Sequence, residues 1–301
     1  MGNSFKSAEY IGVMAALVAT VLWGGAYIAM KFALQSFHPI SMIFFRLFIA
    51  SCISLPFLPL LKRNQTYTKG DWRIFLVLVL CEPCLYFLFE GYALRYTSAS
   101  QAGMLVATFP VFVGVFAFFL LKEKISRIGW VGCFIAICGA VWLSMGAVAD
   151  EHAPQPLLGN FLQVCAMLFA ALYAICVRRL SKNYNAFFIT AVQAWGGTLF
   201  FFPTLFMPGL GVPFDAPLVG WLGVLYLGLG VSLGAYGLYN FSITRMPVPK
   251  ASMYRNLIPV FTLFFGMVIL GERLTLVQWL ASALVLGGVI ISQRPDAKRN
   301  G

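Results

Sequence analysis

Residues 102–143 read AGMLVATFPVFVGVFAFFLLKEKISRIGWVGCFIAICGAVWL, and residues 251–292 read ASMYRNLIPVFTLFFGMVILGERLTLVQWLASALVLGGVIIS. A shift of 149 residues aligns them without a gap. The shared residues are Ala102/Ala251, Met104/Met253, Pro110/Pro259, Val111/Val260, Phe112/Phe261, Phe116/Phe265, Leu121/Leu270, Glu123/Glu272, Trp130/Trp279 and Gly139/Gly288. A shift of 146 also brings Tyr27 onto Tyr173. We therefore predict two related halves, residues 1–149 and 150–301.

The composition around this repeat is that of a membrane protein. The 301 residues are 60% hydrophobic and 16% aromatic, and only 10% are charged. Soluble domains carry about 25% charged residues, so these few charges cannot cover a water-exposed surface. The apolar residues also continue for about twenty positions at a time, the length that one helix needs to cross a bilayer. No polar stretch is long enough to form a separate soluble domain.

Ten apolar runs follow one another along the chain. They are residues 11–33, 40–61, 74–94, 99–121, 127–146, 157–177, 187–206, 218–241, 251–270 and 276–292. The runs are longer than the strands of a membrane barrel and do not alternate as such strands do. Each half holds five spans, an odd number, so the second half must enter the membrane from the opposite side. We predict an all-α integral membrane protein with ten transmembrane helices, arranged as two inverted five-helix repeats.

The basic residues indicate the orientation. Most of the 21 Lys and Arg residues lie in connections on one side, and only Lys31, Arg95 and Arg273 lie at the opposite ends. Cytoplasmic loops carry the excess of positive charge, so we predict a multi-pass protein of the cytoplasmic (inner) membrane with both termini in the cytoplasm. The net charge of +11 is spread over many loops as a topology signal, which excludes nucleic acid as a partner.

Several short motifs are shared with one known family. They are the Trp-Gly-Gly-Ala-Tyr sequence at 23–27, Arg46, the stretch Tyr96–Ala102, and the paired segments Pro110–Glu123 and Pro259–Glu272. In these features the chain resembles, over nearly its whole length, the EamA-type transporters of the drug/metabolite transporter superfamily. The resemblance implies ten helices around a central cavity, alternating access, and small organic substrates. Amino acids, other metabolites, drugs, vitamins and nucleotide derivatives are all substrates associated with such proteins.

Three polar side chains lie along the third run. At about 100° per residue, Glu82, Tyr86 and Glu90 form one stripe of a helix, and Pro83 is expected to kink that helix. Charges inside a membrane are costly and are functional candidates by default. We predict that the stripe lines the cavity and takes up a proton or a cationic group. In the structural alternative, Glu82 pairs with a cation at the inner end and Glu90 reaches the outer water beside Arg95.

Aromatic residues form a second candidate wall. Trp23, Tyr27 and Lys31 recur at helical spacing on the first run, and aromatic walls suit flat or cationic substrates. The alternative is helix packing for the two rings, with Lys31 extended to the outer surface. The second half supplies two further substrate-binding candidates, Tyr173 and Tyr239.

Two arginines, Arg46 and Arg255, lie within spans. Either holds a substrate carboxylate with its paired donors, neutralises a glutamate of the third run, or extends to the nearer membrane face. Gln101 begins the fourth span and either binds substrate or caps the helix. Glu123 and Glu272 repeat at helix connections beside basic residues, and we predict that they maintain the geometry of the connections.

Other classes of protein lack support in the sequence. The seven cysteines lie in apolar runs, and the Cys81/Cys84 pair has no second pair of ligands at metal-binding spacing. The two histidines, His38 and His152, lie in connections, and no nucleophile–base spacing or phosphate-binding loop is present. We therefore expect no enzyme activity, no metal and no cofactor.

The function predicted from these observations is secondary transport. Inverted repeats are characteristic of secondary transporters, whose substrates bind between the halves near the midplane. The leading prediction is export of amino acids or related small organic compounds by alternating access, with protons as a possible coupling ion and membrane lipid around the protein. The alternatives are uptake of an aromatic vitamin or nucleoside-like compound, and a receptor or scaffold that transports nothing. The sequence does not indicate the oligomeric state.

Overall fold

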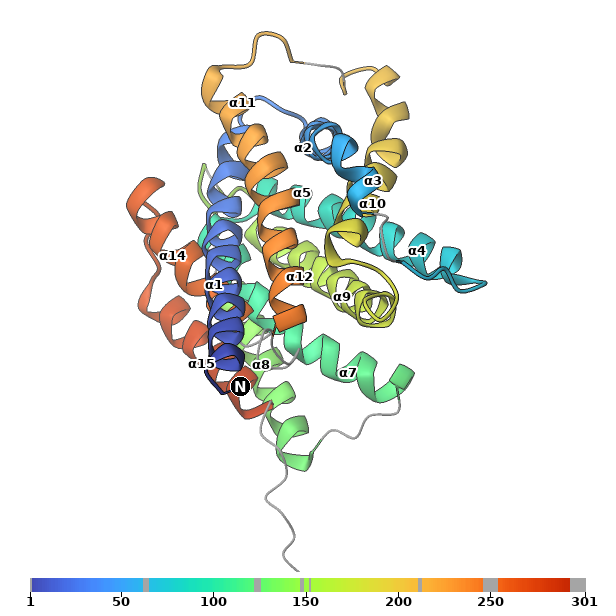
Figure 1. Ribbon diagram of the computed structural model, residues 1–301. Helices are drawn as coiled ribbons and strands as arrows, with labels where there is room; N and C mark the ends of the chain where they lie inside the picture. Colours follow the sequence, from blue (N-terminus) through green and yellow to red (C-terminus); the bar gives the residue numbers. More distant parts are fainter. Residues whose placement is uncertain are drawn as a thin grey trace, which may run out of the picture.

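The computed structural model is helical throughout the part of the chain that it describes, as predicted (Figure 1). It describes residues 2–61, 65–121, 126–146, 149–151, 153–210, 213–245 and 254–292. Eight helical segments in these ranges are long and apolar enough to cross a membrane. They are Tyr10–Ala33, Pro39–Leu61, Asp71–Tyr96, Ala99–Phe116, Arg127–Met145, Pro156–Leu180, Ala186–Phe206 and Leu218–Ser242, and the shorter apolar helices Ile258–Ile269 and Leu276–Ser292 follow. Every predicted run therefore contains apolar helix.

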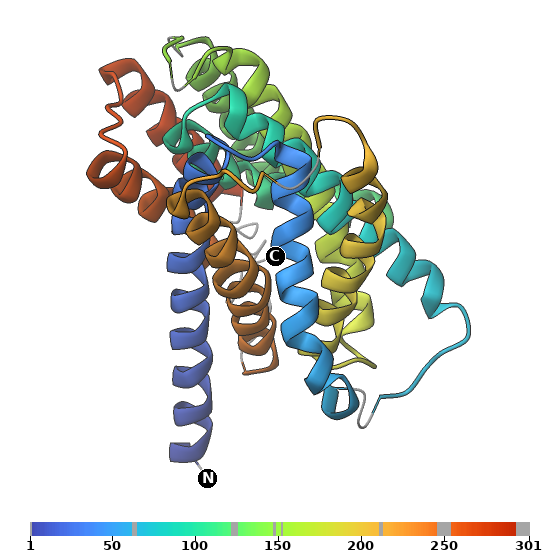
Figure 2. The same ribbon diagram turned by 90° about the horizontal axis from the view of Figure 1, so that it is seen from above.

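The first two spans are long helices joined by a short turn. Helix α1 comprises Gly2–Ala33, and α2 comprises Pro39–Ser54 and continues through η1 (Leu55–Phe57) into α3 (Leu58–Leu61). The start of α2 is specified locally, because Pro39 occupies the first turn and His38 accepts a hydrogen bond from the Ile40 amide at 3.3 Å. In Figure 2 the N-terminal end of α1 and the C-terminal ends of α3 and α12 (Tyr236–Arg245) lie on the same side of the molecule.

The third span is broken in its middle. Helix α4 (Asp71–Val79) passes through the π-helical segment η2 (Leu80–Leu85) into α5 (Tyr86–Tyr96). Glu82 has extended backbone angles, φ −147° and ψ 116°, because the proline that follows disfavours the helical region for the residue before it. The expected kink is present. The continuous stripe through Glu82, Tyr86 and Glu90 is wrong at Glu82, where the helical spacing does not hold.

The eighth span has a π-helical segment at the corresponding place and stays helical through it. Helix α11 (Leu218–Leu225) passes through a second π-helical segment, η5 (Tyr226–Ala235), into α12. Under the shift of 149 residues, η2 falls inside η5. The two π-helical segments thus lie at equivalent positions of the predicted halves.

A second pair of irregular segments follows the same shift. In the fourth span η3 (Val106–Thr108) separates α6 (Ala99–Leu105) from α7 (Phe109–Leu121). In the ninth, a turn at residues 256–257 precedes α14 (Ile258–Ile269). The predicted run 251–270 is therefore not one continuous helix, because Pro259 stands in the first turn of α14, where proline favours a helix start. The beginning of this run, residues 251–253, lies outside the described residues, as do Glu123 and His152.

The last helices of the two predicted halves pack against each other. They are α8 (Arg127–Met145) and α15 (Leu276–Ser292). A Cβ atom at Gly288 would lie 2.3 Å from the Ala136 amide nitrogen, and one at Gly132 would lie 2.2 Å from that of Ser292. Glycine is therefore required at both positions, as in other close helix pairs of membrane proteins.

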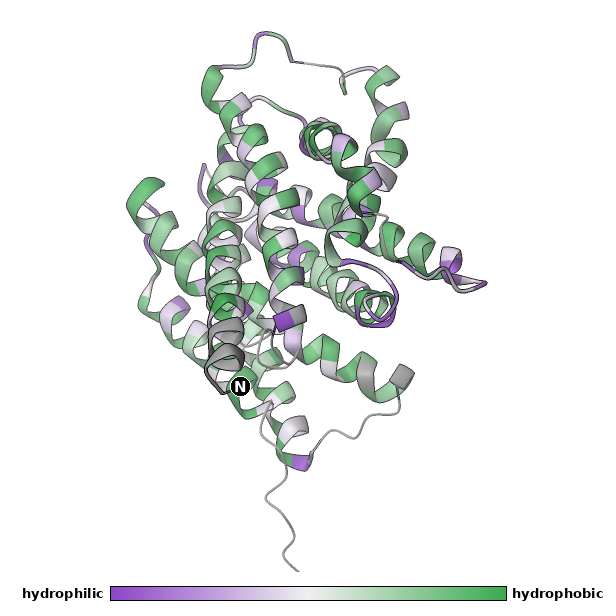
Figure 3. Ribbon diagram, in the orientation of Figure 1, coloured by the Kyte–Doolittle hydropathy of each residue, from purple (hydrophilic) through white to green (hydrophobic). Residues whose placement is uncertain are grey.

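Polar residues lie inside this helical protein and apolar residues outside. The described helices are apolar along most of their length, with isolated hydrophilic positions between them (Figure 3). Large apolar side chains such as Leu199, Phe206 and Met145 are at least 75% exposed, whereas Arg46, Glu82 and Glu90 are at most 4% exposed. A lipid-facing exterior around a polar interior explains this distribution. The chain is a multi-pass membrane protein.

Candidate functional site

A small cavity at the middle of the bundle collects several of the predicted residues. We call it the central site. Its lining residues are Trp23, Ala26, Tyr27, Arg46, Tyr86, Phe87, Glu90, Val106, Met167, Val231, Tyr236, Arg255 and Ile258. Its volume of about 20 Å³ has room for about one water molecule. The structure thus gathers Trp23, Tyr27, Tyr86, Glu90 and Arg255 around one small cavity.

Glu90 is held by two tyrosines. Its Oε1 accepts hydrogen bonds from the hydroxyls of Tyr27, at 3.0 Å, and Tyr86. The Tyr27 hydroxyl in turn accepts one from Gln163 Nε2 at 3.3 Å. Glu90 is only 4% exposed, so the alternative in which it reaches water beside Arg95 is wrong. Helix α9 (Pro156–Leu180) supplies Gln163, and no local pattern on the first three spans indicates that contact.

Glu82 lies behind this cavity and is joined to it by Tyr236. The Tyr236 hydroxyl, at the start of α12, donates to Glu82 Oε1, while Oε2 is buried without a partner. Within the described residues no ion pair reaches Glu82, so its pairing with an inner-end cation is not observed. Sequence reasoning missed Tyr236. A signal was available, since Tyr236 falls on Phe87 under the 149-residue shift and both line the central site.

Arg46 is fully enclosed, with 1% of its surface exposed. Its Nε donates to Ser232 Oγ at 3.2 Å, and its guanidinium carbon lies 3.9 Å from the centroid of the Phe87 ring. The interpretation that Arg46 extends to a membrane face is therefore wrong.

Arg255 lies in a box of aromatic rings. Its guanidinium carbon is 4.2 Å from the ring centroid of Phe109, 4.7 Å from that of Trp23 and 5.2 Å from that of Tyr239. Cation–π contacts of this kind stabilise a cation away from water. The Nε atom is buried and has no hydrogen-bond partner. The Arg255 guanidinium thus points into the protein, and its Nε–H is a donor without an acceptor.

The central charges are enclosed without being paired directly. Two guanidinium groups and the Glu90 carboxylate line one cavity and Glu82 lies behind it, yet none of the contacts described for these four side chains is an ion pair. A buried charge is costly unless a partner compensates it. Such an arrangement can accept a small molecule that carries both a positive and a negative group.

Besides Glu82, three predicted residues lie outside the central site. Tyr239 packs beside it, with its ring 5.2 Å from that of Trp23. Tyr173 lies one layer further, where its hydroxyl donates to Gln193 Oε1 at 3.2 Å. Gln101 belongs to a separate group at the start of α6, where its Oε1 accepts from Asn160 Nδ2 at 2.8 Å. These residues reach a substrate only if the helices rearrange.

Glu272 has the structural role that was predicted for it. Its Oε1 accepts from the Ala99 amide at 2.9 Å, and its Oε2 from the Ser100 amide at 2.8 Å. A carboxylate there satisfies unpaired amides of α6 and faces the positive end of the helix dipole. The contact joins the connection before α15 to the start of α6. In the described residues no three His, Cys, Asp or Glu side chains come together as a metal site.

A multi-helix bundle with apolar faces and a polar centre defines an integral membrane protein. The sequence profile of the EamA-like transporter family matches residues 10–145 and again residues 157–293. The chain belongs to this family.

Curated relatives match this chain over most of its length. The Bacillus subtilis uncharacterized transporter YetK is 29% identical over 259 residues, which cover 84% of this chain and 78% of the relative. An uncharacterized transporter of Archaeoglobus fulgidus is 24% identical over 90% of this chain and 93% of its own. A WAT1-related chloroplastic protein of Arabidopsis thaliana is 24% identical over 91% of this chain and 67% of its own. A solved crystal structure shares the fold, with a TM-score of 0.65, 19% identity and 96% coverage of both chains.

Proposed function

We propose that this protein is a secondary transporter that exports amino acids or closely related small organic compounds across the cytoplasmic membrane by alternating access. The observation that carries the proposal is the set of unpaired charges at the central site. An amino acid has an ammonium and a carboxylate on one carbon atom, so it needs one anionic and one cationic partner close together. Glu90 and Arg255 line the same cavity and supply these partners.

The two partners are held ready in different ways. Tyr27 and Tyr86 fix the Glu90 carboxylate through one oxygen, so its position is set before an ammonium group arrives. Arg255 is fixed by rings rather than by hydrogen bonds, and its Nε is unpartnered. Carboxylate binding would satisfy that donor with a charge-assisted hydrogen bond. Such preorganisation reduces the free-energy cost of ordering the site on binding.

Alternating access follows from the closed centre and the broken helices. A cavity of about 20 Å³ cannot hold an amino acid, so helices must move for binding and release. The break in η2 and the π-helical segment η5 lie beside the central site, and broken helices near the midplane are typical of transporters built from inverted repeats. The distribution of basic residues supports an orientation with both termini in the cytoplasm, and the beginning of α1 and the end of α12 lie on one side of the molecule (Figure 2).

Protons are the proposed coupling ion, with uncoupled exchange as the alternative. Glu82 and Glu90 are buried carboxylates near two fixed cations, and each accepts a tyrosine hydrogen bond. A proton on either glutamate would change the net charge of the site by one. Binding and release of that proton are then linked to which side the site faces.

The alternative substrates have weaker support. An aromatic vitamin or nucleoside would need a free ring face for stacking. The Trp23 ring already contacts Arg255, Tyr236 and Tyr239, so side chains of the protein itself already pack against it. No specific observation favours a receptor or scaffold.

The test is transport by purified protein in liposomes. Labelled amino acids, vitamins and nucleosides are offered with and without a pH gradient. We expect saturable transport of an amino acid, and a loss of about tenfold or more in Glu90→Gln and Arg255→Gln, since each removes a charged partner. Arg179→Gln, at the exposed end of α9, is the matched control.

Two results would contradict the proposal. Transport of a vitamin or nucleoside, and of no amino acid, would replace the substrate class. Unchanged transport and pH dependence in both Glu82→Gln and Glu90→Gln would remove proton coupling.

A further inference from the structure

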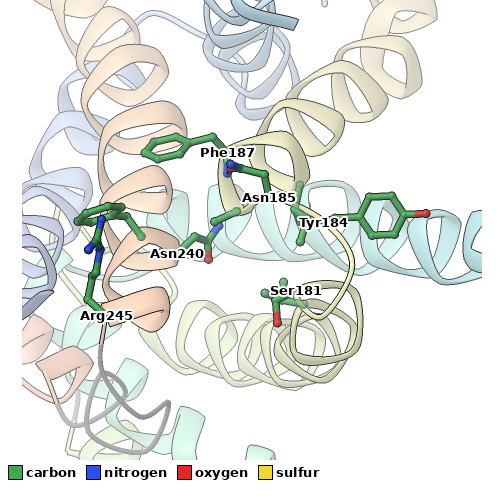
Figure 4. A pocket seen from close by; sticks show the side chains of 10 residues that line it. Ser181, Tyr184, Asn185, Phe187, Asn240 and Arg245 are labelled. Atoms are coloured by element: carbon green, nitrogen blue, oxygen red, sulfur yellow. The ribbon is translucent and has the colours of Figure 1, made fainter. Parts of the chain in front are cut away.

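A second and much larger cavity lies at one end of the bundle (Figure 4). We call it the vestibule. It has a volume of about 290 Å³ and is lined by Val177, Ser181, Tyr184, Asn185, Ala186, Phe187, Ile189, Asn240, Phe241 and Arg245. These residues come from the end of α9, the start of α10 (Ala186–Phe201) and the end of α12. Helix α12 ends on the same side as the beginning of α1 (Figure 2), which is the side predicted to be cytoplasmic.

The two cavities differ in what they can hold. The vestibule approaches the size of pockets that bind small organic ligands, about 300 Å³ and more. The central site, at about 20 Å³, holds no such molecule in this conformation. A substrate bound to this state of the protein would therefore occupy the vestibule, before the central site opens or after it closes.

Among the described residues that line the vestibule, one is a cation and none is acidic. Arg245 is exposed at the end of α12, with its guanidinium carbon 5.0 Å from the centroid of the Phe241 ring. In Figure 4 Arg245 lies on one side of the cavity and Ser181 and Tyr184 on the other, with Asn240 between them, while the Tyr184 hydroxyl points away. That hydroxyl donates to Asp71 at 3.0 Å, so Tyr184 contributes its ring and not a polar group.

Apolar and amide groups complete the lining. The side chains of Phe187, Phe241, Val177 and Ile189 provide an apolar wall. The oxygen of the Asn185 side chain accepts from the Phe187 amide at 2.8 Å, which leaves its NH₂ group as a donor. One guanidinium with an amide donor suits a carboxylate, and the apolar wall suits the body of an apolar or aromatic molecule.

A chain of contacts leads from the vestibule to the central site. Asn240 donates to Thr190 Oγ1 at 3.0 Å. Thr190, Gln193 and Tyr236 line a space of about 10 Å³ between the two cavities. Tyr236 also lines the central site and donates to Glu82. The vestibule is thus separated from the central charges by a few side chains.

We propose that the vestibule is a second substrate site, which holds a carboxylate with an apolar or aromatic body on Arg245 at the cytoplasmic end of the transport path. The inference rests on the proposed function and narrows it to acids with apolar side chains. It adds a residue, Arg245, that no sequence pattern singled out. Binding at the vestibule needs a carboxylate and does not need an amine.

The experiment measures protection from labelling and does not depend on transport. Ser181→Cys is labelled with a membrane-impermeant maleimide in detergent, and the wild-type protein gives the background rate of the native cysteines. The probes are 3-phenylpropionate, which has only the acid, and phenethylamine, which has only the amine. We expect 3-phenylpropionate to protect the cysteine and phenethylamine not to do so. Arg245→Gln should weaken protection by about tenfold or more, whereas Arg245→Lys and Arg179→Gln retain it.

The outcomes separate this inference from the proposed function. Protection that persists in Glu90→Gln, while transport is lost, supports both sites. Protection without amino acid transport by the wild type leaves the vestibule in place and overturns the proposed substrate. Four results would each overturn the proposal that the vestibule binds a carboxylate on Arg245. They are equal protection by both probes, unchanged protection in Arg245→Gln, no protection by 3-phenylpropionate, and no labelling of Ser181→Cys above background.

Discussion

Removal of the Glu272 carboxylate should destabilise the protein without changing how it binds substrate. The carboxylate accepts two amide hydrogen bonds, at 2.9 and 2.8 Å, from the start of α6. Hydrogen bonds to a charged group contribute about 1.5–3 kcal/mol each. Glu272 is partly exposed, so the lower end of that range applies, and the two bonds together contribute about 3 kcal/mol. Glu272→Ala should lose this amount, and Glu272→Gln, which keeps one acceptor oxygen, about half of it.

The assay is equilibrium unfolding in mixed detergent micelles, together with transport by the fraction that remains folded. Glu151→Ala is the matched control, because Glu151 is an exposed acidic residue of a connection. We expect stability to fall in the order wild type, Glu272→Gln, Glu272→Ala, and the KM for transport to be the same in all three. Equal stability of Glu272→Ala and Glu151→Ala would refute the capping role, and a changed KM at normal stability would show that Glu272 contacts substrate.

Three further predictions concern packing, pH and the buried arginine. Gly288→Leu should weaken the contact between α8 and α15 by about 1–3 kcal/mol or prevent folding, because overpacking is destabilising. Equilibrium unfolding of the purified variant measures the loss of stability. Burial and the hydrogen bond to Asp71 raise the pKa of Tyr184 to about 12. Its stabilisation is therefore complete below the ordinary pKa of 10.0 and is lost only as the pH rises through about 12. Tyr184→Phe should thus cost about 1 kcal/mol, equally at pH 6 and pH 9, in the same unfolding assay. Arg46→Lys keeps the charge but loses the bond from Nε to Ser232; liposome transport should fall about fivefold or more, and an unchanged rate would contradict a positional role.

The sequence predicted the helices well because a bilayer imposes a simple requirement. About twenty apolar residues in succession must form a helix, since lipid offers no partner to a free backbone amide. All ten predicted runs contain helix in the described residues. What the runs did not indicate is where helices break. The extended backbone at Glu82 and the turn before α14 lie beside prolines, but a proline in an apolar run is also compatible with a continuous, bent helix.

The candidate site was predicted in part. Trp23, Tyr27, Tyr86 and Glu90 stood out because polar and aromatic residues recur at helical spacing on single spans. The match of Tyr236 to Phe87 under the 149-residue shift was a signal that sequence reasoning did not use. The position of Arg46 depends on a contact between different spans, and a single sequence carries no signal for such a pair. Gln101 was singled out for its place at a helix start, yet the structure pairs it with Asn160, away from the central site.

The amino-acid sequence by itself thus determined the membrane class, the helical segments and the family, because hydrophobic run length and repeated motifs are local properties of the chain. Only the tertiary structure decided which charges share a cavity. Glu82 and Tyr236 are 154 residues apart in sequence, and Arg46 and Ser232 are 186 apart. Each pair meets because helices of both predicted halves pack around one enclosed centre, where a buried charge must find the few partners within reach.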